Sequence, residues 1–434
     1  DGWFETPEIR RWAVRPRVLW EGEGGRSLFA TVGTTQEDRL SGTAPGAVLP
    51  WGSPWPESAR TERLDGGLVF HQPWGGRLVQ VRASAGSTKR DRMLGPSPEG
   101  DRTSFSHLEA TLSATAGRHT WVAGGAFDHD HLDARERPDL GFHRSIPALF
   151  AQDEVRLSPV WSLSGSLRGE HLDEEGSVLD VRLSTLAHFS NAWSARGSLG
   201  SGHALPTPLT EETDAVGLTR VQLLETLAPE RGQFASLDVT WRGKEVEAEV
   251  GIFTSEVRSP LVLVPLEPPG GALAVVNAVS PLRVDGAELL LHATLGPVHL
   301  IVSDALMHGS EPLDAGPETQ PVTEVPRHAA EVAAIVEDER RGRVGFEASY
   351  IGHQHIEDDP DPDAGSPYWD VSFLAELRIR QVRVFVNALN LADVRLTEHA
   401  PFLLPTPSPT GRPTTEVWAP QEGRYFNAGV RLQF

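Results

Sequence analysis

Residues 423–434 read GRYFNAGVRLQF and alternate between apolar and polar side chains. Phe426 and Val430 fall on one parity, and Asn427 and Arg431 fall on the other. Because successive side chains of a strand point to opposite faces, an extended strand here carries one apolar and one polar face. Such a strand is typical of the closing strand of a membrane β-barrel, and equally of a half-buried strand in a soluble sandwich. Recurrence of the pattern along the chain decides between them.

The alternation recurs in segments of about ten residues, joined in turn by tight turns and by long polar or Pro-rich stretches. In residues 369–380, for example, Trp369 and Val371 alternate with Asp370 and Ser372. About nineteen such segments can be counted, whereas a single-chain bacterial barrel has an even number. The long stretches fall on one side of the predicted sheet, where they predict the external face: 203–232, 257–283, 308–326 and 391–423.

The amino-acid composition of this 434-residue chain limits the possible fold classes and the possible binding partners. Hydrophobic residues make up 39% of it and the mean hydropathy is -0.27. No run approaches the roughly 20 apolar residues of a membrane helix, which excludes a helical membrane bundle but not a barrel. The absence of cysteine excludes disulfides and thiolate metal sites. A net charge of -21 disfavours nucleic acid as a partner.

These observations predict an all-β fold, an antiparallel transmembrane β-barrel. The membrane interpretation rests on the number of successive two-faced strands with turns of unequal length. Trp20, Trp161, Trp193 and Trp241 stand at predicted strand ends, where an aromatic girdle would lie at the membrane interface.

Several strand and loop motifs are similar to those of one known family of barrels. They are 384–395 (VFVNALNLADVR), the Pro-rich stretch 401–413, 417–434 (VWAPQEGRYFNAGVRLQF), 200–212 (GSGHALPTPLTEE) with 227–230 (LAPE), and 150–159 (FAQDEVRLSP). They resemble the barrel strands and loops of TonB-dependent outer-membrane receptors.

The resemblance implies a barrel of about 22 strands with an amino-terminal plug in its lumen. It also implies import of a scarce nutrient, such as a siderophore, haem, cobalamin or an oligosaccharide, with TonB energy coupling through a segment ahead of the plug. Residues 1–434 are then expected to be the carboxy-terminal barrel domain alone, with about 19 of the 22 strands and no plug. We expect a monomer in the outer membrane of a Gram-negative-type bacterium, in contact with lipid and with a small-molecule ligand.

Two other classes of function fit the alternation. A passive porin-like channel would have the same strands without energy coupling, and a soluble all-β binding module would bury the apolar faces between stacked sheets. An enzyme is not expected, because the chain has no G-x-S-x-G, P-loop, G-x-G-x-x-G or H-E-x-x-H motif. No cofactor is expected.

Ligand-binding side chains are predicted on the polar, lumen-facing parity of the strands. Charged residues there can hydrogen-bond a ligand as it passes along the wall. The candidates are Arg82, Glu109, Arg168, Glu376 and Arg378.

Two histidine pairs have a spacing that can chelate zinc or copper, since each puts two imidazoles on one strand face. They are His129 with His131 and His353 with His355. No third or fourth ligand accompanies either pair, so we predict solvated residues at the external rim and no metal site.

The acidic stretch 357–365 (EDDPDPDAG) spaces three aspartates as a calcium loop does, at Asp359, Asp361 and Asp363. Ala364 stands where an EF-hand needs glycine, and the prolines stiffen the backbone. A solvated acidic loop is the simpler prediction.

Overall fold

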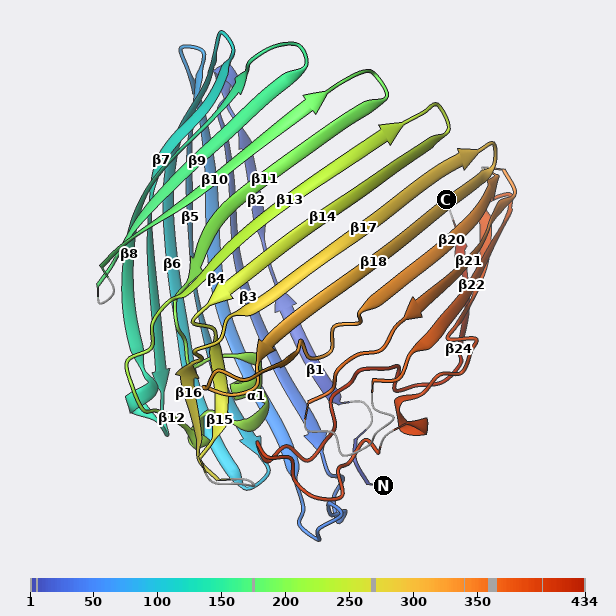
Figure 1. Ribbon diagram of the computed structural model, residues 1–434. Helices are drawn as coiled ribbons and strands as arrows, with labels where there is room; N and C mark the ends of the chain where they lie inside the picture. The colour runs from blue at the N-terminus through green and yellow to red at the C-terminus, as the bar shows by residue number, and fades with distance from the viewer. Residues whose placement is uncertain are drawn as a thin grey trace.

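The main feature of the fold is one antiparallel sheet of 21 strands that curves around a lumen (Figure 1). It confirms the predicted all-β class and contradicts the soluble alternative, which needs two stacked sheets. The computed structural model describes residues 2–4, 7–173, 176–266, 271–338, 340–357, 365–399 and 401–432.

The strands of the large sheet follow one another along the chain. They are β1 (Glu8–Val14), β2 (Arg17–Glu21), β3 (Ser27–Gly42), β4 (Pro56–Trp74), β5 (Arg77–Leu94), β6 (Ser97–Ala116), β7 (His119–Ala134), β8 (Phe142–Arg156), β9 (Trp161–Leu172), β10 (Gly176–His188), β11 (Trp193–Ala204), β13 (Glu230–Arg242), β14 (Val246–Arg258), β17 (Leu282–Leu295), β18 (Val298–Pro312), β19 (Thr319–Pro321), β20 (His328–Asp338), β21 (Gly342–Ile351), β22 (Tyr368–Ile379), β23 (Val382–Leu389) and β24 (Tyr425–Leu432).

The described strands run between the two ends of the wall 19 times, as the sequence predicts. β1 and β2 lie end to end along β3, separated at Pro16, and β19 and β20 both lie along β18, so the 21 strands make 19 passes. Within the described residues, no pairing joins β24 to β1 or β2. No helix there is long and apolar enough to cross a membrane.

One face of the wall is apolar and open to the surroundings. Leu149 is 75% exposed and Val430 is 63% exposed. The register keeps like side chains on one face, since Val384 lies opposite Val430 in the β23–β24 pair. The other face of this pair is polar, and Asn387 Nδ2 donates to Asn427 Oδ1 at 2.9 Å. A wall that leaves its apolar face uncovered is suited to lipid.

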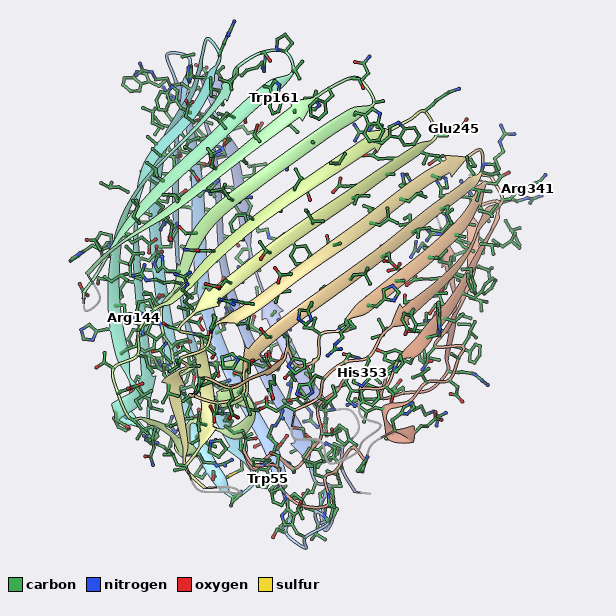
Figure 2. The ribbon with its side chains drawn as sticks, viewed as in Figure 1. Trp55, Arg144, Trp161, Glu245, Arg341 and His353 are labelled. Carbon is green, nitrogen blue, oxygen red and sulfur yellow. The ribbon has the colours of Figure 1, made fainter. Side chains whose placement is uncertain are left out.

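The two ends of the wall differ, as the spacing of the segments predicts. One end carries short turns, and we call it the turn end; the other carries the long connections, and we call it the loop end (Figure 1). Trp161 lies at the turn end in Figure 2. Trp193 and Trp241, which lie opposite each other in the β11–β13 pair, have ring centroids 6.5 Å apart there. Trp20, at the end of β2, joins the same rim, so the predicted girdle forms at the turn end.

The strands near the N-terminus are longer than the predicted ten residues, which corrects the sequence analysis. β6 has 20 residues, and β5 and β6 pair as far as Leu94 and Ser97. The extension carries charges on both faces, which hides the apolar alternation. Cross-strand ion pairs satisfy them, as where Arg90 Nε lies 2.9 Å from Asp101 Oδ2.

The long connections at the loop end are themselves folded, which alternation could not predict. Two hydrophobic cores stabilise them: Ala134, Leu140, Leu218, Val221, Leu227 and Val275 form one, and Ile356, Leu396, Trp418 and Ala419 form the other. Each fully buried leucine contributes about 1.5–3 kcal/mol. The connections contain α1 (Glu211–Val216) and a small sheet of β12 (Val221–Leu223), β16 (Leu273–Asn277) and β15 (Leu261–Pro265).

Candidate functional site

Arg82 and Glu109, predicted separately, form a pair on the polar face of the wall. They lie directly opposite each other on β5 and β6, and Arg82 Nη1 is 3.5 Å from Glu109 Oε1. Their neighbours Val81 and Leu108 belong to the opposite, apolar face. The pair is partly open to solvent and can exchange one of its contacts for a ligand.

Arg168 joins a larger network on the same polar face. Its guanidinium hydrogen-bonds Glu170 on its own strand, and Nη2 lies 3.9 Å from Asp128 Oδ2 on β7. The guanidinium carbon lies 5.6 Å from the ring centroid of Phe150 on β8, which adds a cation–π contact. Asp128 in turn contacts the imidazole of His107 on β6. The network therefore spans four adjacent strands, β6 to β9, on the polar face of the wall.

His203, at the end of β11, extends this network and was missed in the sequence. Its Nδ1 lies 2.6 Å from Asp180 Oδ2 and its Nε2 lies 3.1 Å from Glu170 Oε2, with the side chain 7% exposed. The imidazole thus links the two carboxylates on the polar face of the wall. The two carboxylates come from different strands, and no spacing in the sequence indicates that they meet.

Glu376 and Arg378 lie far from the loop end. Glu376 Oε1 is 3.3 Å from Arg383 Nη1 on β23. The backbone N–H of Arg378 donates to Arg341 O at 2.8 Å, and Figure 2 places Arg341 at the turn end. These two predicted residues are therefore near the turn end. Their strand, β22, does not pair with β5, β6 or β9, so the structure does not bring them together with Arg82, Glu109 and Arg168.

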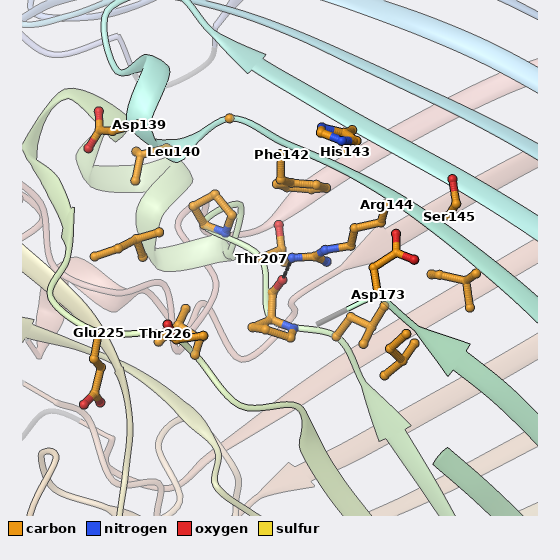
Figure 3. Close-up of a pocket in the computed structure, with 18 of the residues that line it drawn as sticks. Asp139, Leu140, Phe142, His143, Arg144, Ser145, Asp173, Thr207, Glu225 and Thr226 are labelled. Carbon is orange, nitrogen blue, oxygen red and sulfur yellow. Dashed lines mark hydrogen bonds between the residues drawn. The ribbon is translucent and has the colours of Figure 1, made fainter. Parts of the chain in front are cut away.

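A cavity of about 500 Å³ opens at the loop end, on the inner side of the wall. Its walls are residues 139–146 at the start of β8, Leu172 and Asp173 at the end of β9, and residues 205–208 and 223–227 (Figure 3). Its size is within the range of small-molecule sites. Neither the cavity nor its residues could be predicted from alternation, because four separate segments build it.

Arg144 is the central polar group of this cavity. It reaches from β8 toward residues 206 and 207, and its Nη2 donates to Pro206 O (Figure 3). Its guanidinium carbon lies 4.2 Å from the ring centroid of Phe142. Ile146 and Leu172 supply apolar surface. The cavity can hold a ligand with an aromatic or aliphatic part and polar groups, and its acidic lining residues are Asp139, Asp173 and Glu225.

A buried ion-pair cluster fixes the connection that covers the cavity. Arg92 Nη2 on β5 lies 2.8 Å from Glu99 Oε2 on β6, and their side chains are 5% and 4% exposed. Arg92 Nη1 also lies 2.8 Å from Asp214 Oδ1 on α1. Glu99 Oε1 accepts hydrogen bonds from the backbone N and the Oγ1 of Thr219, both at 2.8 Å. The long β5–β6 hairpin thus holds residues 205–229 in place.

The histidine pairs are not assembled into a metal site. Among the described residues, no group of three or more His, Cys, Asp or Glu is placed to hold a metal ion. His129 Nδ1 lies 3.1 Å from Ser145 Oγ, and His355 Nε2 lies 3.4 Å from Gln320 Oε1. His131 and His353 are exposed. The predicted calcium-like aspartates, Asp359, Asp361 and Asp363, lie outside the described residues.

Comparison with known proteins shows the family to which this barrel belongs. The model of the β-barrel of TonB-dependent receptor-like proteins matches residues 27–391. No curated protein sequence matches the chain.

Solved receptor structures have the same fold at low sequence identity. The siderophore receptor PirA from Acinetobacter baumannii is 12% identical, with a TM-score of 0.76 over 99% of this chain and 71% of that chain. The ferric-catecholate import receptor Fiu from E. coli is 13% identical, with a TM-score of 0.68 over 100% of this chain and 76% of that one. The iron transporter FrpB from Neisseria meningitidis is 14% identical, with a TM-score of 0.73 over 98% and 73%.

The family model covers most of the chain, and the open apolar face agrees with it. Barrels of this family lie in the outer membrane of Gram-negative bacteria, so the loop end is external and the turn end is periplasmic. The chain belongs to the β-barrel family of TonB-dependent receptors, which are outer-membrane transport receptors.

Proposed function

We propose that the barrel captures an iron-loaded siderophore in the loop-end cavity and conducts it along the polar wall to the periplasm. Import would draw energy from the TonB complex through a plug and coupling segment, as the resemblance implies. The neighbours' own functions motivate the choice of siderophore as cargo. The barrel is proposed to act as a monomer.

The observation that carries this proposal is the position of the cavity. It lies on the inner side of the wall, and Arg144 on β8 stands one strand from Arg168 on β9 and three strands from His203 on β11. A ligand leaving the cavity would meet the network of His203, Glu170 and Arg168 next. Capture at the loop end and passage along the wall are therefore spatially continuous.

Replacing Arg144 with alanine is expected to weaken siderophore binding about tenfold, because one anchoring side chain in a pocket contributes on the order of 1–2 kcal/mol. The Phe142→Ala substitution, which removes the ring beneath the guanidinium, should have a similar effect. Binding of ferric catecholate and ferric hydroxamate siderophores to the purified protein, measured by calorimetry in detergent, checks this.

The control is Arg340→Ala, which removes an exposed arginine at the turn end and should leave binding unchanged. If neither class of siderophore binds the parent protein, the cargo is not a siderophore. If Arg144→Ala binds as well as the parent, the cavity is not the capture site.

Along the wall, Glu109→Gln and Arg168→Ala are expected to reduce siderophore uptake roughly three- to tenfold without impairing barrel assembly. Each removes a charge that can contact the passing ligand. Uptake of radioactive iron by cells that depend on this receptor measures the first effect, and heat-modifiable migration in electrophoresis measures the second. An assembly defect with normal uptake would contradict the role. Uptake that persists after the proton gradient is collapsed would favour a passive channel.

A further inference from the structure

Three arginines come together on the outer face of the wall, where three neighbouring strands reach the loop end. Arg231 lies at the start of β13, Arg258 at the end of β14 and Arg283 at the start of β17. Arg231 is directly opposite Arg258 in the register of β13 and β14. Opposite residues of an antiparallel pair point to the same face, and like charges in such positions repel each other. Positive charge therefore gathers here, although the whole chain has a net charge of -21.

Glu256 is the carboxylate at the centre of this cluster, and it contacts two of the three guanidinium groups. Its Oε1 lies 2.6 Å from Arg258 Nε, and its Oε2 lies 2.7 Å from Arg283 Nε. The two arginine side chains are still 63% and 59% exposed. Asp285 lies two residues farther along β17, opposite Thr254. Because a guanidinium has five N–H donors and each hydrogen bond to Glu256 uses Nε, the terminal donors can bind a further anion.

The face that carries the cluster is the apolar, lipid-facing one. Nearer the turn end, the same face exposes Leu237 on β13 and Ile252 on β14, which lie opposite each other. The register of the two strands continues without a break from this pair to Arg231 and Arg258. Since side chains alternate between faces at every residue, the even spacing puts the arginines and the apolar residues on one side.

The cluster lies at the height of the external membrane boundary. Trp241 belongs to the girdle at the turn end and lies on the same face of β13, ten residues after Arg231. Ten residues of strand are about 33 Å long. A tilt of about 40° reduces this length to about 25 Å across the membrane, which is also the height of the apolar band of such barrels. The arginines are therefore level with the lipid headgroups of the external leaflet.

We propose that Arg231, Arg258 and Arg283 bind the phosphate groups of a lipid in the external leaflet, whose acyl chains lie along the apolar residues of β13 and β14. Guanidinium groups bind phosphate oxygens through parallel N–H donors. A phosphate between Arg231 and Arg258 neutralises the repulsion of this directly opposed pair. The site is independent of the cargo that the barrel imports.

Native mass spectrometry of the detergent-purified protein, titrated with lipid A, tests the proposal. Lipid A is a glycolipid with two phosphate groups, and a one-to-one complex is expected. The same lipid without its phosphate groups should bind much more weakly, and equal affinities would overturn the proposal. Inorganic phosphate at the concentration of lipid A should not displace the lipid; displacement would assign the cluster to a free anion and would also overturn it.

The double variant Arg258→Ala with Arg283→Ala should bind lipid A roughly twentyfold more weakly, because each arginine near an anionic surface contributes about fivefold. The barrel should still assemble, since exposed ion pairs contribute little to stability, and heat-modifiable migration verifies this. The matched control is Arg242→Ala, which removes a 67% exposed arginine from the turn end of β13 and should bind as the parent does. Parental affinity in the double variant would overturn the proposal.

Glu256→Gln should change the affinity in the opposite direction. It removes the carboxylate that competes with phosphate for Arg258 and Arg283, so lipid A should bind about fivefold more tightly. A poorly folded variant cannot produce such a gain. Unchanged or weaker binding of lipid A by Glu256→Gln would contradict the competition and overturn the proposed site.

Discussion

Replacing Arg92 with alanine is expected to release residues 205–229 from the rim of the barrel. Arg92 and Glu99 are almost fully buried, and Arg92 also holds Asp214 of α1. Removing one partner of a buried ion pair leaves the other charge without compensation, which costs on the order of 3–5 kcal/mol. Arg90 Nη1 also lies 2.6 Å from Asp214 Oδ1, and Glu99 accepts two hydrogen bonds from Thr219. In the variant these contacts would border the uncompensated charge of Glu99, so the cost falls on the attachment of the connection.

Hydrogen exchange measured by mass spectrometry checks this expectation. Peptides from 205–229 should lose protection in Arg92→Ala, while those from β13 and β14 should keep it. The control is Arg60→Ala on the neighbouring strand, because the Arg60–Glu62 pair is 55% and 48% exposed and such pairs contribute about 0–1 kcal/mol. Unchanged protection of 205–229 in Arg92→Ala would show that the hydrophobic core alone holds the connection. Since residues 205–208 line the cavity, siderophore binding should weaken together with the loss of protection.

Replacing Gly342 with valine is expected to prevent most of the protein molecules from assembling into a folded barrel. Gly342 begins β21 with a φ of 121°, a conformation that side chains with a Cβ rarely adopt, at a cost of about 1–3 kcal/mol. A Cβ there would also lie 1.9 Å from the backbone oxygen of Glu376 on β22. Since that neighbour is a backbone atom, only a shift of β21 against β22 relieves the clash. Such a shift disturbs the register, which decides the apolar and the polar face along the whole strand.

Heat-modifiable migration in electrophoresis measures the folded fraction. Gly296→Val separates the two causes, because Gly296 also has a positive φ, of 63°, but a Cβ there would meet nothing within 4 Å. It should assemble much better than Gly342→Val. Equal yields for the two variants would mean that the β21–β22 pair tolerates the clash.

The alternation of side chains predicted the barrel because it reflects a single physical requirement. Each pass of the wall puts one face toward lipid and one toward water, so residues such as Val430 and Asn427 must alternate wherever the wall crosses the membrane. The number of passes and the girdle at Trp161 and Trp193 followed from the same requirement. Beyond the membrane the requirement ends, so alternation does not predict the extension of β5 and β6.

The candidate site was predicted only in part. Parity placed Arg82, Glu109 and Arg168 on the polar face, and the register then put the first two directly opposite each other. It could not show how the strands are placed around the barrel, so Glu376 and Arg378 on β22 were grouped with residues on β5, β6 and β9. His203 and Arg144 were missed, because their partners belong to other strands and connections.

The sequence by itself determined which side of every strand faces lipid, because burial against hydrocarbon acts on each residue locally and repeats every second position. Only the tertiary structure decided which residues meet across strands and connections. The Arg92–Asp214 contact joins positions far apart in the chain, and so does the His203–Glu170 contact. Such contacts depend on the distance between folded segments, and no local pattern in the sequence encodes that distance.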